Sequence, residues 1–208
     1  MLNVGAIASA NATREPFPYF LAQVLDKKDV DSIRADFPQI DKPGIFPLDA
    51  LNYGPAFASL IEELKSPEVA KAIGKQLGVD LTALPTMITV RGRAQAKDGR
   101  IHTDTRDKVA TCLLYLNGAW EESGGRLRIL RNGEDLEDYI AEVPPNGGTF
   151  LAFKVSPNSW HGHKPFVGER RYVMMNWLRS EAARSRQLGR HKLSAKVKRL
   201  IPFFYSGK

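Results

Sequence analysis

The feature that most constrains the fold is a run of short strand-like segments between residues 84 and 178, separated by turns that contain glycine or proline. In residues 109–117 both the odd and the even positions are largely apolar, the pattern of a strand covered on both faces. Further strand-like segments follow at 126–130, 139–143, 149–153 and 171–178. Many short strands joined by such turns are typical of a sandwich or jelly roll. We therefore predict a mainly β fold.

The residues before the strand-rich part have helical patterns. Residues 29–37 show rough helical spacing, with Asp29 as the capping residue and a proline directly after them. Residues 55–64 place their apolar side chains three and four positions apart. Ser66 followed by a proline predicts the start of another helix, which ends at Gly78. We expect these helices to brace one face of the β core.

Length and composition favour one globular domain, because the chain has 208 residues, of which 43% are hydrophobic and 25% charged. We divide it into a helical support region (1–83), a β core (84–178) and a basic tail (179–208). The single cysteine, Cys112, excludes an internal disulfide and fits a reducing compartment, so we expect a cytoplasmic protein. No segment is long and apolar enough to span a membrane, and the first residues do not have the pattern of a signal peptide.

Three residues have the types and spacing of a metal site. His102 and Asp104 are two positions apart, so on an extended strand an imidazole and a carboxylate point to the same side. His161 lies 59 residues further along, a separation that suits strands on facing sheets. Two histidines and one carboxylate on one side of an ion are the arrangement of non-haem Fe(II) centres that activate oxygen. The sequence therefore predicts a mononuclear iron site, with His163 as the alternative to His161.

A cation follows this group. Arg171 is ten residues after His161, which leaves room for a turn and the start of a new strand. Its planar guanidinium could hold a carboxylate through two hydrogen bonds.

These residues and the segments around them resemble the iron(II)- and 2-oxoglutarate-dependent dioxygenases, most closely the prolyl-4-hydroxylase-like branch. The resemblance covers about residues 84–178. Besides His102, Asp104, His161 and Arg171, it is carried by 109–117 (VATCLLYLN), 123–129 (SGGRLRI) and 147–153 (GGTFLAF). It implies a double-stranded β-helix, or jelly roll, that is braced by the N-terminal helices.

The resemblance also implies roles for individual residues. His102, Asp104 and His161 would hold Fe(II), while Arg171 and Tyr115 would bind the distal carboxylate of 2-oxoglutarate. Relatives place an inward tryptophan six residues after the cosubstrate cation. Trp177 is six residues after Arg171, which favours Arg171 over Arg170.

One position departs from the pattern of some relatives, which carry a second cosubstrate-facing tyrosine before the first histidine. This sequence reads Val90-Arg91-Gly92-Arg93 there, and the residue in that role is left open.

Such an enzyme would use O2 to convert 2-oxoglutarate to succinate and carbon dioxide while it hydroxylates a C–H bond. The substrate is not specified by the sequence: a prolyl residue of a protein, a small metabolite, a sugar and a lipid head group all stay open. Candidate substrate contacts are Arg93 and Arg106, in and after a basic loop, and Trp177. Oligomeric state is also not readable from the sequence.

The basic charge of the chain lies in its tail. Residues 179–208 carry nine Lys or Arg and one acid, or +8, against +7 for the whole chain, so the remainder carries −1. The tail mixes these bases with Phe203, Phe204 and Tyr205. It could dock on the domain, lie on an anionic membrane surface, or bind nucleic acid, in that order of preference. The alternative function is accordingly a non-catalytic jelly-roll module that binds through this tail.

Overall fold

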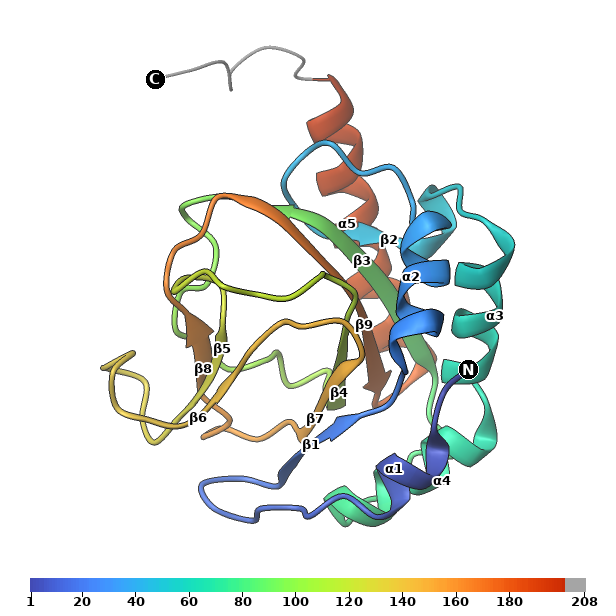
Figure 1. The fold of residues 1–208 in the computed structure, drawn as a ribbon. Helices are drawn as coiled ribbons and strands as arrows, with labels where there is room; N and C mark the ends of the chain where they lie inside the picture. Colours follow the sequence, from blue (N-terminus) through green and yellow to red (C-terminus); the bar gives the residue numbers. More distant parts are fainter. Residues whose placement is uncertain (201–208) are drawn as a thin grey trace.

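The computed structural model describes residues 1–200, and side chains up to residue 190 (Figure 1). Its helices are α1 (Val4–Ala8), α2 (Lys27–Ala35), the short 3₁₀ helix η1 (Leu48–Ala50), α3 (Pro55–Leu64), α4 (Pro67–Leu77) and α5 (Glu181–Leu200). Its strands are β1 (Tyr19–Gln23), β2 (Phe46–Pro47), β3 (Thr86–Ala94), β4 (Lys108–Tyr115), β5 (Leu127–Leu130), β6 (Tyr139–Val143), β7 (Thr149–Lys154), β8 (His161–His163) and β9 (Gly168–Leu178).

The strands form two antiparallel sheets. A six-stranded sheet has the order β1-β7-β4-β9-β3-β2, and a three-stranded sheet has the order β6-β5-β8. The helices α2 and α3 cover the large sheet on the side away from β5, β6 and β8 (Figure 1). The predicted mainly β fold with bracing helices is confirmed. Strands β1 and β2, from the helical N-terminal part of the chain, extend the two edges of the large sheet.

Two apolar cores lie on opposite faces of the large sheet. One core joins the sheet to the helices and contains Val173, Met175 and Trp177 from β9, together with apolar side chains of α3 and α4. The other contains Tyr172 and Met174 from the same strand, together with Leu127 and Ile129 of the small sheet. The barrel interior is therefore lined by the second set. Because successive strand residues point to opposite faces, neighbouring residues of β9 lie in different environments.

The capping residues explain where the helices begin. Ser66 accepts a hydrogen bond from Val69 N at the start of α4, and Gly78 ends that helix in the left-handed conformation, both as predicted. The predicted range of α3 is also confirmed. In α2 the capping residue is Asp26, whose carboxylate accepts from Asp29 N. The choice of Asp29 as the cap was therefore wrong, because this residue already lies in the first turn.

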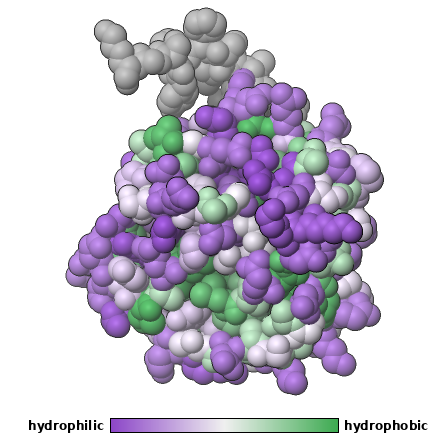
Figure 2. All heavy atoms as spheres, viewed as in Figure 1, coloured by the Kyte–Doolittle hydropathy of each residue, from purple (hydrophilic) through white to green (hydrophobic). Residues whose placement is uncertain are grey.

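The described residues contain no helix that is long and apolar enough to cross a membrane. In the view of Figure 2, hydrophilic residues cover most of the surface, with smaller apolar patches between them.

Candidate functional site

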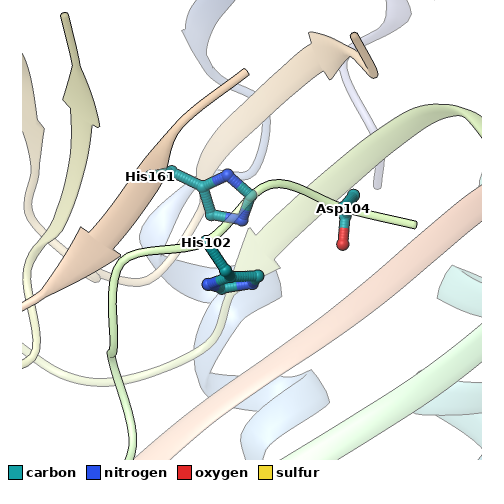
Figure 3. Close-up of side chains that lie close together, drawn as sticks. All are labelled: His102, Asp104 and His161. Atoms are coloured by element: carbon teal, nitrogen blue, oxygen red, sulfur yellow. The ribbon is translucent and has the colours of Figure 1, made fainter. Parts of the chain in front are cut away.

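His102, Asp104 and His161 come together at one end of the barrel. One potential ligand atom from each residue lies within 4.8 Å of the other two. His161 belongs to β8, while His102 and Asp104 lie in the segment before β4 (Figure 3). The segments meet because the backbone N–H groups of His102 and His161 each donate to the other's carbonyl oxygen, at 3.0 Å. His102 is exposed and His161 is buried, so the group lies at the boundary between solvent and the barrel interior.

Backbone carbonyls orient both imidazoles. Nδ1 of His102 lies 2.8 Å from the carbonyl oxygen of Arg100, and Nδ1 of His161 lies 2.9 Å from that of Ser159. A carbonyl oxygen can only accept, so each Nδ1 carries the proton and each Nε2 keeps a free lone pair. This is the outer-shell arrangement that fixes metal-binding histidines. The two histidines and the carboxylate therefore fit a divalent iron ion.

Asp104 is held by two buried partners. Lys108 Nζ donates to one of its carboxylate oxygens at 2.7 Å, and Thr111 Oγ1 donates to the other at 2.5 Å. The side chains of Asp104 and Lys108 are only 10% and 8% exposed. Burial by itself raises the pKa of Asp104, but the charges of Lys108 and His161 and the hydrogen bonds of Lys108 and Thr111 lower it to about 2. The carboxylate is thus ionised and fixed in orientation before a metal binds.

We expect Lys108→Met to destabilise the metal-free protein by about 3 kcal/mol, because it leaves the buried carboxylate of Asp104 without its cation. The double variant Lys108→Met/Asp104→Asn should recover most of this loss, since it removes the unpaired charge. Urea unfolding of the wild type, both single variants and the double variant measures the coupling. A double variant no more stable than Lys108→Met would contradict the pairing.

His161 and His163 are both buried, at 5% and 6% exposure. Burial is the main cause that lowers the pKa of each to about 4, and the positive charge of Arg170 also lowers that of His163. Nδ1 of His163 lies 2.8 Å from the carbonyl oxygen of Lys164. Within the described residues His163 is not part of the metal-ligand group, so the geometry favours His161 as the ligand.

These two histidines predict how stability depends on pH. Both pKa values are below the ordinary value of 6.5, so the unfolded chain binds more protons than the folded one between pH 6.5 and 4. The free energy of unfolding of the metal-free protein should therefore fall as the pH is lowered through that window, by up to about 1.4 kcal/mol per pH unit for each histidine. In His163→Asn the free energy of unfolding should depend less steeply on pH, by the contribution of one proton, or about 1.4 kcal/mol per pH unit. Denaturant titration at several pH values measures this dependence. The same pH dependence in His163→Asn as in the wild type would contradict the lowered pKa of His163.

A second polar group lies further inside the barrel, around Tyr115 and Arg170. Nη2 of Arg170 donates to the Tyr115 hydroxyl at 3.3 Å, and its Nε donates to the Gly125 carbonyl oxygen at 2.8 Å. Arg170 is 2% exposed, and its guanidinium carbon lies 5.2 Å from the Tyr172 ring centroid. Burial raises the pKa of Tyr115, while Arg170 lowers it; with its pKa raised overall, the tyrosine is neutral and can donate. A guanidinium beside a phenol can bind a carboxylate.

The structure places Arg170 in the barrel interior and Arg171 outside it, against the preference for Arg171; which of the two binds a cosubstrate stays a prediction. Arg171 lies on the other face of β9: its Nη2 pairs with Glu169 at 2.8 Å and its guanidinium carbon lies 5.3 Å from the Phe37 ring centroid. Trp177 shares that face and packs in the core between sheet and helices, 1% exposed. It is therefore not brought to the site as a substrate contact. The alternation along the strand was correct, but the face assigned to the barrel interior was the opposite one.

The remaining candidates for substrate contact lie at the surface. Arg93 and Arg106 are exposed, and within the described residues neither belongs to the metal-ligand group. Sequence reasoning gave no role to Thr111 and Lys108, which hold Asp104, or to the buried Arg91. For Thr111 a signal was available, since it shares a strand face with Tyr115.

Comparisons with known proteins agree with this geometry. Residues 92–179 match the family model described as the 2OG-Fe(II) oxygenase superfamily. No curated protein is similar enough to count as a match.

Three solved structures are similar. The first is a prolyl-4-hydroxylase of Pseudomonas putida, with TM-score 0.56 and 18% identity over 85% of this chain and 97% of that one. The second is a prolyl 4-hydroxylase of Phytophthora capsici, with TM-score 0.52 and 18% identity over 77% and 58%. The third is the viral collagen prolyl hydroxylase of Paramecium bursaria Chlorella virus-1, in complex with 2OG, with TM-score 0.52 and 15% identity over 78% and 95%. At these identities the likeness establishes the shared jelly-roll fold.

Proposed function

We propose that the chain is a 2-oxoglutarate-dependent dioxygenase of the 2OG-Fe(II) oxygenase superfamily, whose family model matches residues 92–179, and that it hydroxylates a C–H bond of its substrate. The observation that carries the proposal is the pairing of two groups in one barrel. His102, Asp104 and His161 meet at its end, and Arg170 with Tyr115 lies inside it. The first group suits a metal ion, and the second suits the distal carboxylate of 2-oxoglutarate.

In this proposal His102, Asp104 and His161 hold the iron, while Arg170 and the Tyr115 hydroxyl bind the distal carboxylate of 2-oxoglutarate. Iron, 2-oxoglutarate and O2 together supply oxidative decarboxylation, which yields succinate and carbon dioxide and inserts one oxygen atom into the substrate. The chain itself orients the reactants. Lys108 and Thr111 fix the direction of the Asp104 carboxylate.

Apolar side chains of the barrel interior keep water away from these groups. Leu113, Leu151, Phe153 and Met174 are buried in the core between the sheets. A carboxylate that enters this space exchanges its water shell for the fixed donors of Arg170 and Tyr115. Exclusion of water strengthens these charged hydrogen bonds.

Hydroxylation can be tested by mass spectrometry with purified Fe(II) enzyme, 2-oxoglutarate and O2. Proline-containing peptides are the leading candidates, because the similar structures are named as prolyl hydroxylases; small metabolites, sugars and lipid head groups form the comparison set. We expect succinate to form together with a substrate product heavier by one oxygen atom, and neither to form with Asp104→Ala. Succinate without any oxygenated product across the whole panel would count against every substrate class proposed here.

For the basic tail we propose docking on the domain through its first part. Arg186 pairs with Asp107 at 2.7 Å, and Arg179 Nε donates to the Arg106 carbonyl oxygen at 2.7 Å. These contacts join the tail to the segment that follows Asp104. The aromatic residues 203–205, on which membrane or nucleic-acid binding was predicted, lie outside the described residues, and a peripheral membrane role stays a proposal. Liposome and oligonucleotide binding by the whole chain, compared with a chain ending at residue 200, tests it.

A further inference from the structure

A second buried arginine faces the same part of the barrel as Arg170. Arg91, on β3, is paired in register with Tyr172 of β9, which in turn is paired with Tyr115 of β4. The guanidinium carbons of Arg91 and Arg170 lie 5.8 Å and 5.2 Å from the centroid of the Tyr172 ring. Both guanidiniums therefore lie close to one aromatic ring.

The partners of Arg91 leave donors unused. Its Nη1 is paired with the Asp98 carboxylate, which also accepts from Gln95 N. Its Nε is buried and, among the described residues, has no hydrogen-bond partner. A guanidinium has five N–H donors, and a buried one is ordinarily well satisfied. Burial lowers the pKa of Arg91, but its interactions with Tyr172 and Asp98, which include a hydrogen bond to each, outweigh burial and raise the pKa, so the group is charged.

A count of buried charges gives the ligand chemistry. Of the four buried cations among the described residues, Arg128 is neutralised by its partner Glu142. Lys108, Arg91 and Arg170 contribute three positive charges, and Asp98 and Asp104 two negative ones, so these five residues carry +1. A divalent iron ion and the 2-oxoglutarate dianion cancel each other and leave this charge unchanged. A buried charge without a counterion is costly, which favours one further anionic group in the loaded site.

We propose that Arg91 is a second carboxylate-binding residue of the barrel, with Asp98 as the counterion that occupies it until a ligand carboxylate binds. The carboxylate belongs either to 2-oxoglutarate or to an acidic primary substrate, and the charge count favours the second source because it already includes the 2-oxoglutarate dianion. Only the first source rests on the proposed function. Arg91 belongs to the segment Val90-Arg91-Gly92-Arg93 before the first histidine, in which the residue with a second cosubstrate-facing role was left open.

A purely structural role for this ion pair makes a different prediction. Asp98 lies four residues before His102, and its neighbour Gly99 accepts a hydrogen bond from His163 N at 2.9 Å. If the pair only holds this loop in place, Arg91→Gln and Asp98→Asn should weaken ligand binding equally, because both break the pair. If Arg91 binds a carboxylate, the two variants should differ: Arg91→Gln loses the binding group, whereas Asp98→Asn removes its competitor.

The test measures binding to the Zn(II)-loaded protein, which cannot turn over. Calorimetry follows 2-oxoglutarate, and saturation-transfer NMR follows acetate, the simplest carboxylate, with and without 2-oxoglutarate. We expect Arg91→Gln to weaken one of these ligands by about 10-fold or more, while Asp98→Asn leaves its affinity unchanged or increases it. If Arg91→Gln loses affinity for 2-oxoglutarate, the carboxylate that Arg91 binds belongs to the cosubstrate. If it loses acetate binding while 2-oxoglutarate is present, that carboxylate belongs to the primary substrate.

Matched controls come from an exposed ion pair of the same types. Arg131 and Asp138 are paired at 2.7 Å with side chains 57% and 36% exposed; Arg131→Gln and Asp138→Asn should change neither affinity. Equal losses in Arg91→Gln and Asp98→Asn, or no loss in Arg91→Gln, would overturn the proposal. If Arg91→Gln does not fold, Asp98→Asn decides alone, because weaker carboxylate binding by Asp98→Asn than by the wild type would overturn the proposal. Absence of 2-oxoglutarate binding in the wild type would instead refute the proposed function, and the acetate arm would still decide the role of Arg91.

Discussion

Replacing Arg170 by glutamine should weaken 2-oxoglutarate binding by about 100-fold or more. Arg170 is 2% exposed and its guanidinium already donates to the Tyr115 hydroxyl, so a cosubstrate carboxylate placed there would lose its buried cation. Removal of one partner of a buried charge pair typically costs 2–5 kcal/mol, which is about 30-fold to several thousand-fold in affinity. Calorimetric titration of the metal-loaded, oxygen-free protein measures this loss.

The neighbouring arginine supplies the control. In Arg171→Gln the affinity should stay within about 2-fold of the wild type, because this guanidinium pairs with Glu169 and stacks on Phe37 outside the barrel. An exposed ion pair of this kind contributes little. A larger loss in Arg171→Gln than in Arg170→Gln would mean that the assigned face of β9 is wrong.

Replacing His161 by alanine should remove metal binding almost completely. It takes away one of three protein ligands, and loss of an outer-shell partner alone typically costs 10–100-fold in metal affinity. We therefore expect a loss beyond about 100-fold. Titration with Co(II), whose visible spectrum reports its ligands, gives the affinity without turnover.

His163 is the matched control for this change, because it lies two residues away on the same short strand and is equally buried. His163→Asn should keep Co(II) affinity within a few-fold, since its Nδ1 faces the Lys164 carbonyl oxygen and the residue stands outside the ligand group. Comparable losses in His161→Ala and His163→Asn would show that the choice between the two histidines is not settled by the present geometry.

Much of the fold could be predicted because its signals are local. The apolar spacing of α3, the Ser66 cap and Gly78 stop of α4, and the two-sided apolar pattern of β4 each depend on neighbouring residues only. The three-residue strand β8 has no strand pattern of its own in the sequence, because its pairing with β5 comes from residues far away in the chain.

The meeting of His102, Asp104 and His161 could also be predicted, because the residue types and spacing of a metal site are strongly restricted. Which arginine lies inside the barrel could not be predicted in this way. Arg170 and Arg171 are neighbours that point to opposite faces of β9, so the answer depends on which face of β9 meets the small sheet. That choice is made by the packing of helices on the other face. One local signal did exist: Val173, Met175 and Trp177 are wholly apolar, as a helix-covered face requires, whereas Tyr172 and Asn176 carry polar groups that suit a site.

Arg91 shows a different limit. Its position before the first histidine was noted, but its burial depends on the pairing of β3 with β9 and on the return of the chain that brings Asp98 to it. Neither contact leaves a periodic signal in the sequence.

The most direct test of the central claim is an anaerobic titration of the metal-free protein with Fe(II) and 2-oxoglutarate, read by the visible charge-transfer band of the complex. We predict that the band forms in the wild type and in Arg171→Gln. It should be absent in His102→Ala and need far more 2-oxoglutarate in Arg170→Gln. A folded, iron-loaded wild type that gives no band at saturating 2-oxoglutarate would contradict the account.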